Sequence, residues 1–235
     1  MELKFKRVLL KLSGEALAGD NKMGYDFNIV TDICGKIKEA AQNGAQIAVV
    51  VGGGNFWRGR SSGSMDRTTA DQMGMLATVM NSLAVKDTLK SMGQDAIVMT
   101  SVNMSPIAEH FVKDKAVEYL ENGKVVIFGC GTGSPFFSTD TTAALRAAEI
   151  GADVIMKATM VDGVYDSDPK KNPNAVKYDT LTFSEVLKKE LAVMDSTAAS
   201  MCRDNGLKLL VFSMEQSENI VKAVMGENIG TLVAE

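Results

Sequence analysis

Three short segments rich in glycine and small polar residues could bind phosphate groups, because each directly follows an apolar, strand-like run. They are LSG at 12–14, GGGN at 52–55 and GCGTG at 129–133. Glycine lets backbone N–H groups approach a ligand closely, and successive N–H groups form a concave nest for an anion. One such loop by itself can be only a tight turn between a strand and a helix. Three of them at the carboxyl edge of one sheet predict a site for a long ligand with several negative charges.

Basic side chains beside these loops could neutralise the charge of such a ligand. Lys11 lies in an apolar run, one residue before the first loop. A lysine buried there without an anionic partner would be costly. The alternative is a lysine on an edge strand. Arg58 and Arg60 flank the second loop, and arginine can bind phosphate through two parallel hydrogen bonds.

Three carboxylates, Asp71, Asp140 and Asp195, lie near predicted helix starts. Each could be only a helix cap, or could bind Mg²⁺ or a pair of ribose hydroxyls. The single histidine, His110, is predicted to be a surface or packing residue. The P-loop pattern GxxxxGK[ST] and the dinucleotide pattern GxGxxG are absent, and nothing indicates a Ser-His-Asp or Cys-His nucleophile.

The elements that would position these residues alternate between strand and helix. Continuous apolar strands indicate a mostly parallel sheet with helices on both faces, in one α/β domain with two lobes. A turn-rich connection follows over residues 159–180, and TFSE at 182–185 predicts a helix start through a capping box. Strands are predicted at 7–11, 46–51, 96–100, 124–129, 153–157 and 208–212, and helices near 29–41, 69–92, 113–122, 140–150, 194–205 and 219–225.

Composition excludes several classes of protein. The chain has 235 residues and a net charge of −4, so it lacks the basic surface that nucleic acid requires. No run approaches the ~20 apolar residues of a membrane span. Cys34, Cys130 and Cys202 form no CxxC pair, which argues against a metal or redox site and favours a reducing compartment. We therefore expect a cytoplasmic protein that binds neither nucleic acid nor membrane.

Six motifs follow one another along the chain: KLSGEAL (11–17), VVVGGGNFWRG (49–59), DQMGMLATVMN (71–81), GTGSPFFSTD (131–140), KATMVDGVYDSDP (157–169) and KELAVMDSTA (189–198). Through them the chain resembles the bacterial uridylate kinases, a branch of the amino acid kinase family, over essentially its whole length. The second and third of these motifs are specific to that branch, whereas KLSG alone marks the wider family. The resemblance implies a three-layer α/β/α sandwich around a mostly parallel sheet of about eight strands, with a UMP lobe at roughly 1–150 and an ATP lobe at roughly 151–235.

The resemblance further implies phosphoryl transfer from MgATP to UMP, giving UDP and ADP, in pyrimidine nucleotide biosynthesis. Ser134 departs from the asparagine of many relatives, which leaves a side-chain contact from this position to uracil open. Catalytic roles fall to Lys11, Arg58, Asp140 and Asp195. ATP would be bound by Lys11, Leu12, Ser13, Gly14, Gly54, Arg58, Thr159, Tyr165 and Asp168, and UMP by Gly53, Asp71, Thr132, Gly133, Ser134, Pro135, Phe136, Phe137, Ser138 and Thr139.

Members of the family are typically hexameric, require Mg²⁺ and are inhibited by UTP, and GTP activates some of them. The predicted helix at 69–92 carries an apolar band wider than one core-facing stripe needs, which predicts a subunit interface. The alternative is a fully internal helix. The loop that corresponds to the GTP-responsive segment consists of Gly19, Asp20, Asn21, Lys22, Met23 and Gly24.

Two other functions compete with UMP phosphorylation. A carboxylate or carbamate kinase of the same fold would give no reason for Asp71 or for the PFFST run at 135–139. A nucleotide-binding or storage protein would not need Lys11, Arg58, Asp140 and Asp195 together, because binding alone requires fewer charges.

Overall fold

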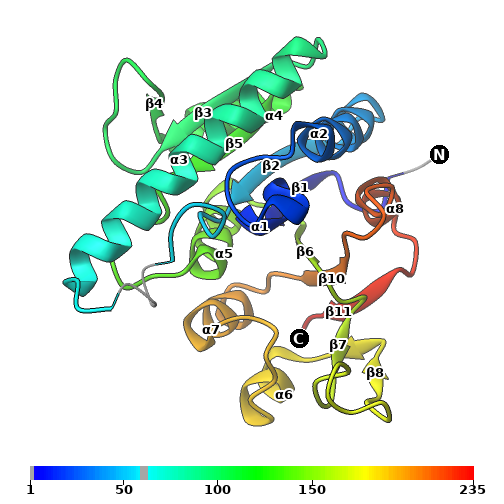
Figure 1. Cartoon of the computed structure of the whole chain (residues 1–235). Coiled ribbons are helices and arrows are strands. Elements are labelled where there is room, and N and C mark those ends of the chain that lie inside the picture. Colours follow the sequence, from blue (N-terminus) through cyan, green and yellow to red (C-terminus); the bar gives the residue numbers. More distant parts are fainter. Residues whose placement is uncertain (1–2, 59–62) are drawn as a thin grey trace.

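A nine-stranded sheet forms the centre of the computed structural model, which describes residues 3–58 and 63–235 (Figure 1). All neighbouring strands are parallel except for one antiparallel pair, β10 with β11. In spatial order the strands are β4 (Glu109–His110), β3 (Ala96–Thr100), β5 (Val125–Gly129), β2 (Gln46–Val51), β1 (Arg7–Leu12), β6 (Val154–Thr159), β10 (Leu209–Ser213), β11 (Gly230–Val233) and β9 (Thr180–Leu181).

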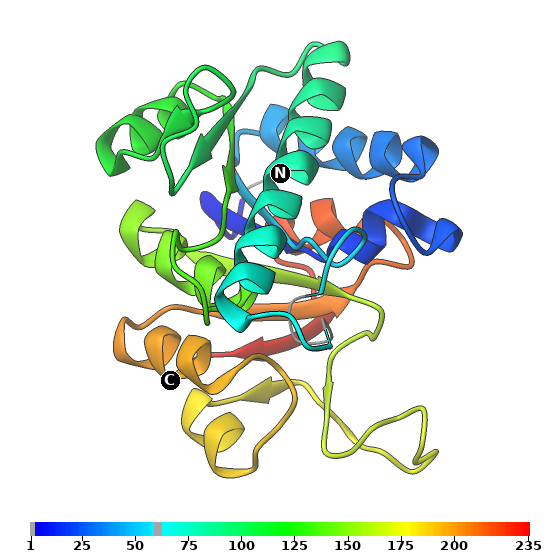
Figure 2. The ribbon, with the colours of Figure 1, turned by 60° about the vertical axis from the view of Figure 1, so that its left-hand side comes forward.

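Helices cover both faces of this sheet, so the predicted three-layer α/β/α architecture is confirmed (Figure 2). The described sheet has nine strands, against the expected number of about eight, because two-residue strands extend both edges. One face packs against α1 (Gly14–Ala18), α2 (Phe27–Gln42), α3 (Arg67–Ser91) and α8 (Asn219–Met225), and the 3₁₀ turn η1 (Gly19–Asn21) follows α1. The other face packs against α4 (Lys113–Glu121), α5 (Thr139–Ile150), α6 (Phe183–Lys188) and α7 (Ser196–Asp204).

Strand β1 lies in the middle of the sheet and carries the lysine that the sequence singles out. Val8, Leu10 and Leu12 point into the core beneath α2, whereas Leu9 belongs to the core on the α5 face. Side chains alternate along a strand, so Lys11 shares the α5 face with Leu9. Because β2 and β6 pair with β1 on its two sides, the edge-strand alternative for Lys11 is wrong.

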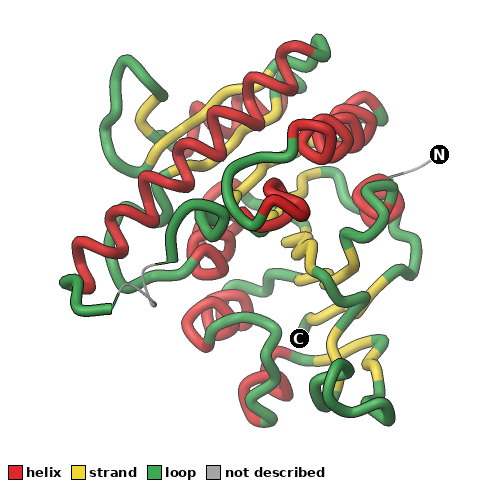
Figure 3. The backbone as a smooth tube through the Cα atoms, viewed as in Figure 1, coloured by secondary structure: helices red, strands yellow, loops and turns green. Residues whose placement is uncertain are grey.

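The turn-rich segment at 159–180 contains a two-stranded antiparallel hairpin outside the main sheet, made of β7 (Val164–Tyr165) and β8 (Lys177–Tyr178). The hairpin strands are tied to β11, because the Thr231 hydroxyl accepts a hydrogen bond from the Val164 backbone N–H and donates one to the Tyr178 carbonyl, whereas long stretches of the segment are loop (Figure 3). The predicted capping box after it is confirmed. The Thr182 hydroxyl accepts a hydrogen bond from the backbone N–H of Glu185, and the Glu185 carboxylate accepts one from that of Thr182.

Helix α3 is only partly internal. Met73, Leu76 and Met80 are 37%, 53% and 48% exposed and recur on one side, while Val79 and Val85 face the core. The alternative of a fully internal helix is therefore wrong. Within the described residues, no helix is both long enough and apolar enough to span a membrane.

Candidate active site

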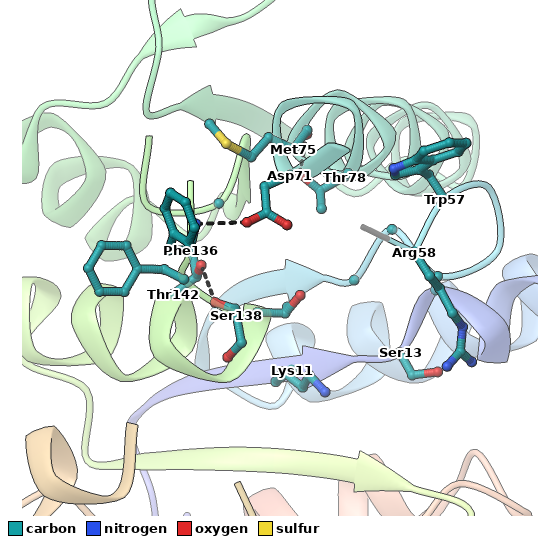
Figure 4. A pocket seen from close by; sticks show the side chains of 18 of the residues that line it. Lys11, Ser13, Trp57, Arg58, Asp71, Met75, Thr78, Phe136, Ser138 and Thr142 are labelled. Atoms are coloured by element: carbon teal, nitrogen blue, oxygen red, sulfur yellow. Dashed lines mark hydrogen bonds between the residues drawn. The ribbon is translucent and has the colours of Figure 1, made fainter. Parts of the chain in front are cut away.

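The carboxyl ends of β1, β2 and β5 meet at a cavity of about 310 Å³, as parallel-sheet topology predicts (Figure 4). Arg60, and Gly59 at the end of the second motif, lie outside the described residues. The predicted site residues that line this cavity are Lys11, Ser13, Gly14, Gly53, Gly54, Arg58, Asp71, Ser134, Phe136, Phe137, Ser138 and Thr139.

The first two glycine loops pack directly against each other, and this contact requires glycine. A Cβ atom on Gly14 would lie 2.5 Å from the carbonyl oxygen of Gly52, and one on Gly53 would lie 2.9 Å from that of Gly74. The Asn81 amide donates a hydrogen bond to the same Gly52 carbonyl at 2.6 Å, which ties the second loop to α3. The loops are thus held in a fixed arrangement, with backbone close to the cavity.

Two lysines on neighbouring strands lie side by side and share one carboxylate. Lys11 of β1 is in register with Lys157 of β6, and both side chains point toward the first turn of α5. Asp140 in that turn lies 3.2 Å from the Lys11 Nζ atom and 2.7 Å from the Lys157 Nζ atom. All three side chains are at most 17% exposed, so the carboxylate compensates charges that would otherwise repel each other in a poorly solvated place.

Burial and charge act in opposite directions on this cluster. Burial alone would raise the pKa of Asp140, but the charges of Lys11 and Lys157 outweigh it and hold that pKa below its ordinary value. Burial lowers the pKa of Lys157, and the charge of Asp140 only partly opposes this effect. Asp140 is therefore ionised at neutral pH, and the cluster has a net positive charge facing the cavity when both lysines are protonated.

Lys157 is a site residue that sequence reasoning missed. Its signal was the same as that of Lys11, namely a lysine within an otherwise apolar strand, in the run DVIMK at 153–157. It also donates a hydrogen bond to the Val193 carbonyl, so it is anchored from two directions.

The three carboxylates near helix starts have different roles. Asp195 is the N-cap of α7, and it accepts hydrogen bonds from the Ala198 backbone at 3.0 Å and from the hydroxyls of Thr141 and Ser138. It thereby joins α7 to the start of α5. Asp140 lies in the first turn of α5, whose N-cap is Ser138, and Asp71 lies one turn into α3, whose N-cap is Asp66. Capping accounts for only one of the three carboxylates.

Asp71 organises the far wall of the cavity. Its Oδ2 atom accepts hydrogen bonds of 2.8 Å from the Phe136 backbone N–H and from the Arg67 Nε atom. Phe136 has a positive φ of 71°, is 63% exposed, and its ring centroid lies 5.5 Å from the Arg67 guanidinium carbon. Phe137 is 52% exposed. Two exposed rings beside a carboxylate and an arginine form a surface suited to a flat, polar base.

Arg58 pairs with Glu15, a residue of α1 that sequence reasoning also missed. The arginine side chain is 65% exposed at the cavity mouth, and a Cβ atom on Gly54 would lie 2.6 Å from the Glu15 Oε1 atom. The Glu15 carboxylate thus lies beside the glycine loop where phosphate would bind. An entering phosphate would compete with Glu15 for Arg58.

A second cavity, of about 480 Å³, lies on the other side of the lysine pair and is lined by Lys157, Thr159, Tyr165 and Asp168. The Tyr165 hydroxyl donates a hydrogen bond of 2.7 Å to the Asp162 carboxylate, which lies in the loop between β6 and β7. Lys11 lines the first cavity and Lys157 the second, so the Lys11–Asp140–Lys157 cluster lies between the two cavities.

Some predicted site residues do not line either cavity. Leu12 is buried in the core. Thr132, Gly133 and Pro135 belong to the loop beside the first cavity, where the Thr132 hydroxyl accepts a hydrogen bond of 3.3 Å from the Ser134 backbone. Residues 19–24 contain one basic side chain, Lys22, and line neither cavity.

Among the described residues, no three His, Cys, Asp or Glu side chains come close enough to hold a metal ion. A magnesium ion carried by the phosphates of a bound ligand would fit this donor set, because such an ion needs few protein ligands. Both Asp140 carboxylate oxygens already pair with lysines, Oδ1 with the Lys11 Nζ atom at 3.2 Å and Oδ2 with the Lys157 Nζ atom at 2.7 Å.

Comparison with known proteins places this geometry in context. The model of the amino acid kinase family matches residues 6–213. A UMP kinase from Bacillus anthracis is similar at 37% identity, with a TM-score of 0.95 and coverage of 98% of this chain and 96% of that one. A UMP kinase from Ureaplasma parvum is similar at 37% identity, with a TM-score of 0.93 and coverage of 98% and 99%. A uridylate kinase from Archaeoglobus fulgidus is similar at 32% identity, with a TM-score of 0.71 and coverage of 97% and 99%.

Proposed function

Because the chain belongs to the amino acid kinase family, we propose that it transfers a phosphoryl group from MgATP to UMP, giving UDP and ADP in pyrimidine nucleotide synthesis. The observation that carries this proposal is the Lys11–Asp140–Lys157 cluster between two cavities, one lined by each lysine. Two ligands bound in these cavities would present their phosphates to each other across shared positive charge.

The chemistry requires little covalent participation by the protein. Phosphoryl transfer depends on an in-line arrangement of donor and acceptor and on neutralisation of the equatorial oxygens. Lys11, Arg58 and the glycine N–H groups supply this charge and orientation, and Mg²⁺ bound to ATP adds more. The acceptor phosphate is largely ionised near pH 7, since its second pKa is about 6. No strong general base is needed, which suits a site that histidine does not line.

We assign the two ligands to the two cavities. UMP occupies the first, with Asp71 at the ribose, Phe136 and Phe137 near the base, and Gly53 and Thr139 toward the phosphate. ATP has its adenosine in the second cavity, against Thr159, Tyr165 and Asp168, and its phosphates reach Ser13, Gly14, Gly54 and Arg58. The linings support this division, since the first cavity involves residues up to 142 and the second only residues from 157 onward. They also support an acceptor lobe of about 1–150 and an ATP lobe of about 151–235 within one domain.

UMP is expected to be the preferred acceptor, with CMP, dTMP and dUMP poor. The Asp71 Oδ1 atom, for which no hydrogen bond is seen among residues 3–58 and 63–235, would bind the ribose hydroxyls, because Oδ2 is occupied by two donors. A group built to bind a hydroxyl is left unpaired by an analogue that lacks it, so kcat/KM for dUMP should fall about tenfold or more. A coupled assay of ADP release measures this result.

Aspartate and acetylglutamate, offered as acceptors in the same assay, test the carboxylate-kinase alternative. If ATP binds but no acceptor leads to ADP formation, that result would support a storage protein. Equal kcat/KM for UMP and dUMP would contradict the role given to Asp71.

A homo-oligomer, and specifically a hexamer, is the assembly we propose, with α3 at a subunit interface. The exposed stripe of Met73, Leu76 and Met80 supports this interface. Light scattering at micromolar protein is expected to give a multiple of the 25.1 kDa chain mass. Leu76→Glu should reduce that mass, because a charge in an apolar interface is left without a partner. The control, Val112→Glu, changes another exposed apolar residue and should leave the mass unchanged.

The same interface would give effectors a route to the acceptor site, because Asp71 lies on α3 close to the stripe. We include activation by GTP through residues 19–24 and inhibition by UTP in the proposal, on the strength of the family resemblance and the exposed loop. A monomeric mass with full activity would contradict both the interface and this control.

The cytoplasm is the compartment we propose for this activity. Its support is that Cys34, Cys130 and Cys202 are all free and buried. Burial raises the pKa of the Cys34 thiol to about 12, which makes it an unreactive core residue.

A further inference from the structure

A buried arginine on α5 has no role in the chemistry described so far. The side chain of Arg146 is 5% exposed, and its guanidinium carbon lies 3.8 Å from the ring centroid of Phe111. Its Nη1 atom pairs with Glu149, and its Nη2 atom donates a hydrogen bond of 2.8 Å to the Ser101 hydroxyl. The Nε atom is buried and has no hydrogen-bond partner among the described residues. An arginine with an unsatisfied N–H is a poor filler beside an aromatic ring, where an apolar side chain would avoid that cost.

The contact with Ser101 fixes the direction of a second hydrogen bond. Arginine can only donate, and a serine hydroxyl has one hydrogen. The Ser101 hydroxyl therefore accepts from Arg146 and directs its own hydrogen to the Gly131 carbonyl, 2.5 Å away. Polarisation by the positive charge strengthens this second bond.

Gly131 belongs to the loop that lines the first cavity. Gly131 and Ser134 both line that cavity, and Gly133, at a φ of 91°, lies against Ser101, where a Cβ atom on the glycine would be 3.1 Å from the Ser101 Cβ. On the opposite side, the backbone N–H of Cys130 donates a hydrogen bond of 2.9 Å to the Thr78 hydroxyl of α3. The loop is clamped between these two contacts, so the Ser101 contact sets how far it extends into the cavity.

We infer that Arg146 and Ser101 are positioning residues for the acceptor: together they hold the 131–134 turn at the depth where it meets the base. This inference rests on the proposed function, because the acceptor is UMP only if that function is correct. Neither side chain lines the cavity, so both act through the Gly131 carbonyl. A displaced loop would weaken acceptor binding and base selection, and the ATP cavity would be unaffected.

The test compares Ser101→Ala with Ser91→Ala. In wild type both serine hydroxyls donate to a backbone carbonyl, Ser101 to Gly131 and Ser91 to Thr88, but Ser91 lies at the distant end of α3. Ser101→Ala should raise KM for UMP about tenfold, and the Kd for UMP measured by calorimetry should rise to a similar extent. The ratio of kcat/KM for UMP to kcat/KM for CMP should fall. KM for ATP should stay within about twofold of wild type for both variants, and Ser91→Ala should leave all these values unchanged.

Arg146→Lys provides a second variant, which keeps the positive charge but loses the forked geometry. It should shift KM for UMP in the same direction as Ser101→Ala, and combining the two changes should give less than the sum of their effects. An unchanged KM for UMP in Ser101→Ala would overturn the inference. So would equal rises in KM for UMP and ATP with a lowered melting temperature, because that pattern indicates general destabilisation. If the wild-type chain phosphorylates another acceptor, the proposed function fails, and the same split between acceptor KM and ATP KM still decides the positioning role.

Discussion

Replacing Lys11 with alanine should lower kcat for UMP phosphorylation about a hundredfold while the protein remains folded. The lysine side chain lines the first cavity and pairs with Asp140, and under the proposed function charge would develop beside it on the transferred phosphoryl group. Loss of one such contact costs about 3 kcal/mol of transition-state stabilisation. The fold should survive, because Asp140 keeps its 2.7 Å pair with Lys157 after the change. Steady-state rates and circular dichroism measure the two parts of this prediction.

A second lysine serves as a matched control for this experiment. The Lys124 Nζ atom lies 3.2 Å from an Asp95 carboxylate oxygen, the same separation as in the Lys11–Asp140 pair, but at the opposite end of the sheet. Lys124→Ala removes an exposed pair of small energetic value and should leave kcat unchanged. Activity of Lys11→Ala within a few-fold of wild type would show that Lys11 is only structural.

The architecture could be predicted from the sequence because its strongest signals are local. Apolar runs separated by helical periodicity indicated a parallel sheet with two covered faces, and the helix predicted at 219–225 coincides with α8. What local signals could not reveal were the shortest elements. The two-residue strands β4, β7, β8 and β9 form only because distant segments pair with them, and their own sequences have no distinct strand pattern.

In the candidate site, too, local features could be predicted from the sequence, whereas contacts between distant segments could not. Glycine loops and a lysine in an apolar strand are visible in the sequence, and they line the first cavity. Pairs across the fold are not visible, since they depend on strand register and helix position. Lys157 becomes part of the site only because its strand aligns it with Lys11, and Arg146 reaches Ser101 across 45 residues of chain. The sequence shows that both are charged residues within apolar segments, but only the structure identifies the residues that they contact.

Changing Asp140 to asparagine should lower both activity and stability, because this carboxylate is shared by two lysines. Asparagine has nearly the same shape but no charge, so Lys11 and Lys157 would face each other in a place where side chains are at most 17% exposed. Removal of one partner from a buried ion cluster typically costs about 3–5 kcal/mol of unfolding free energy. A fall in kcat of about a hundredfold should accompany it, because Lys11 would lose the partner that orients it. Denaturant unfolding and steady-state rates measure the two effects.

Two further variants separate the catalytic effect of Asp140 from its structural one. Asp153 accepts two backbone hydrogen bonds of 2.8 Å at the opposite edge of the sheet, so Asp153→Asn should lower stability with little change in kcat. In a Lys157→Met background, Asp140→Asn should destabilise the protein less, because only one positive charge is then left without a partner. The pKa of Asp140 lies below its ordinary value in the folded state, so its stabilising contribution is present at neutral pH and is lost as the pH falls through that lowered value. The stability gap between wild type and Asp140→Asn should therefore narrow at acid pH. A gap that stays constant with pH, or equal costs in both backgrounds, would show that charge balance is not what Asp140 provides.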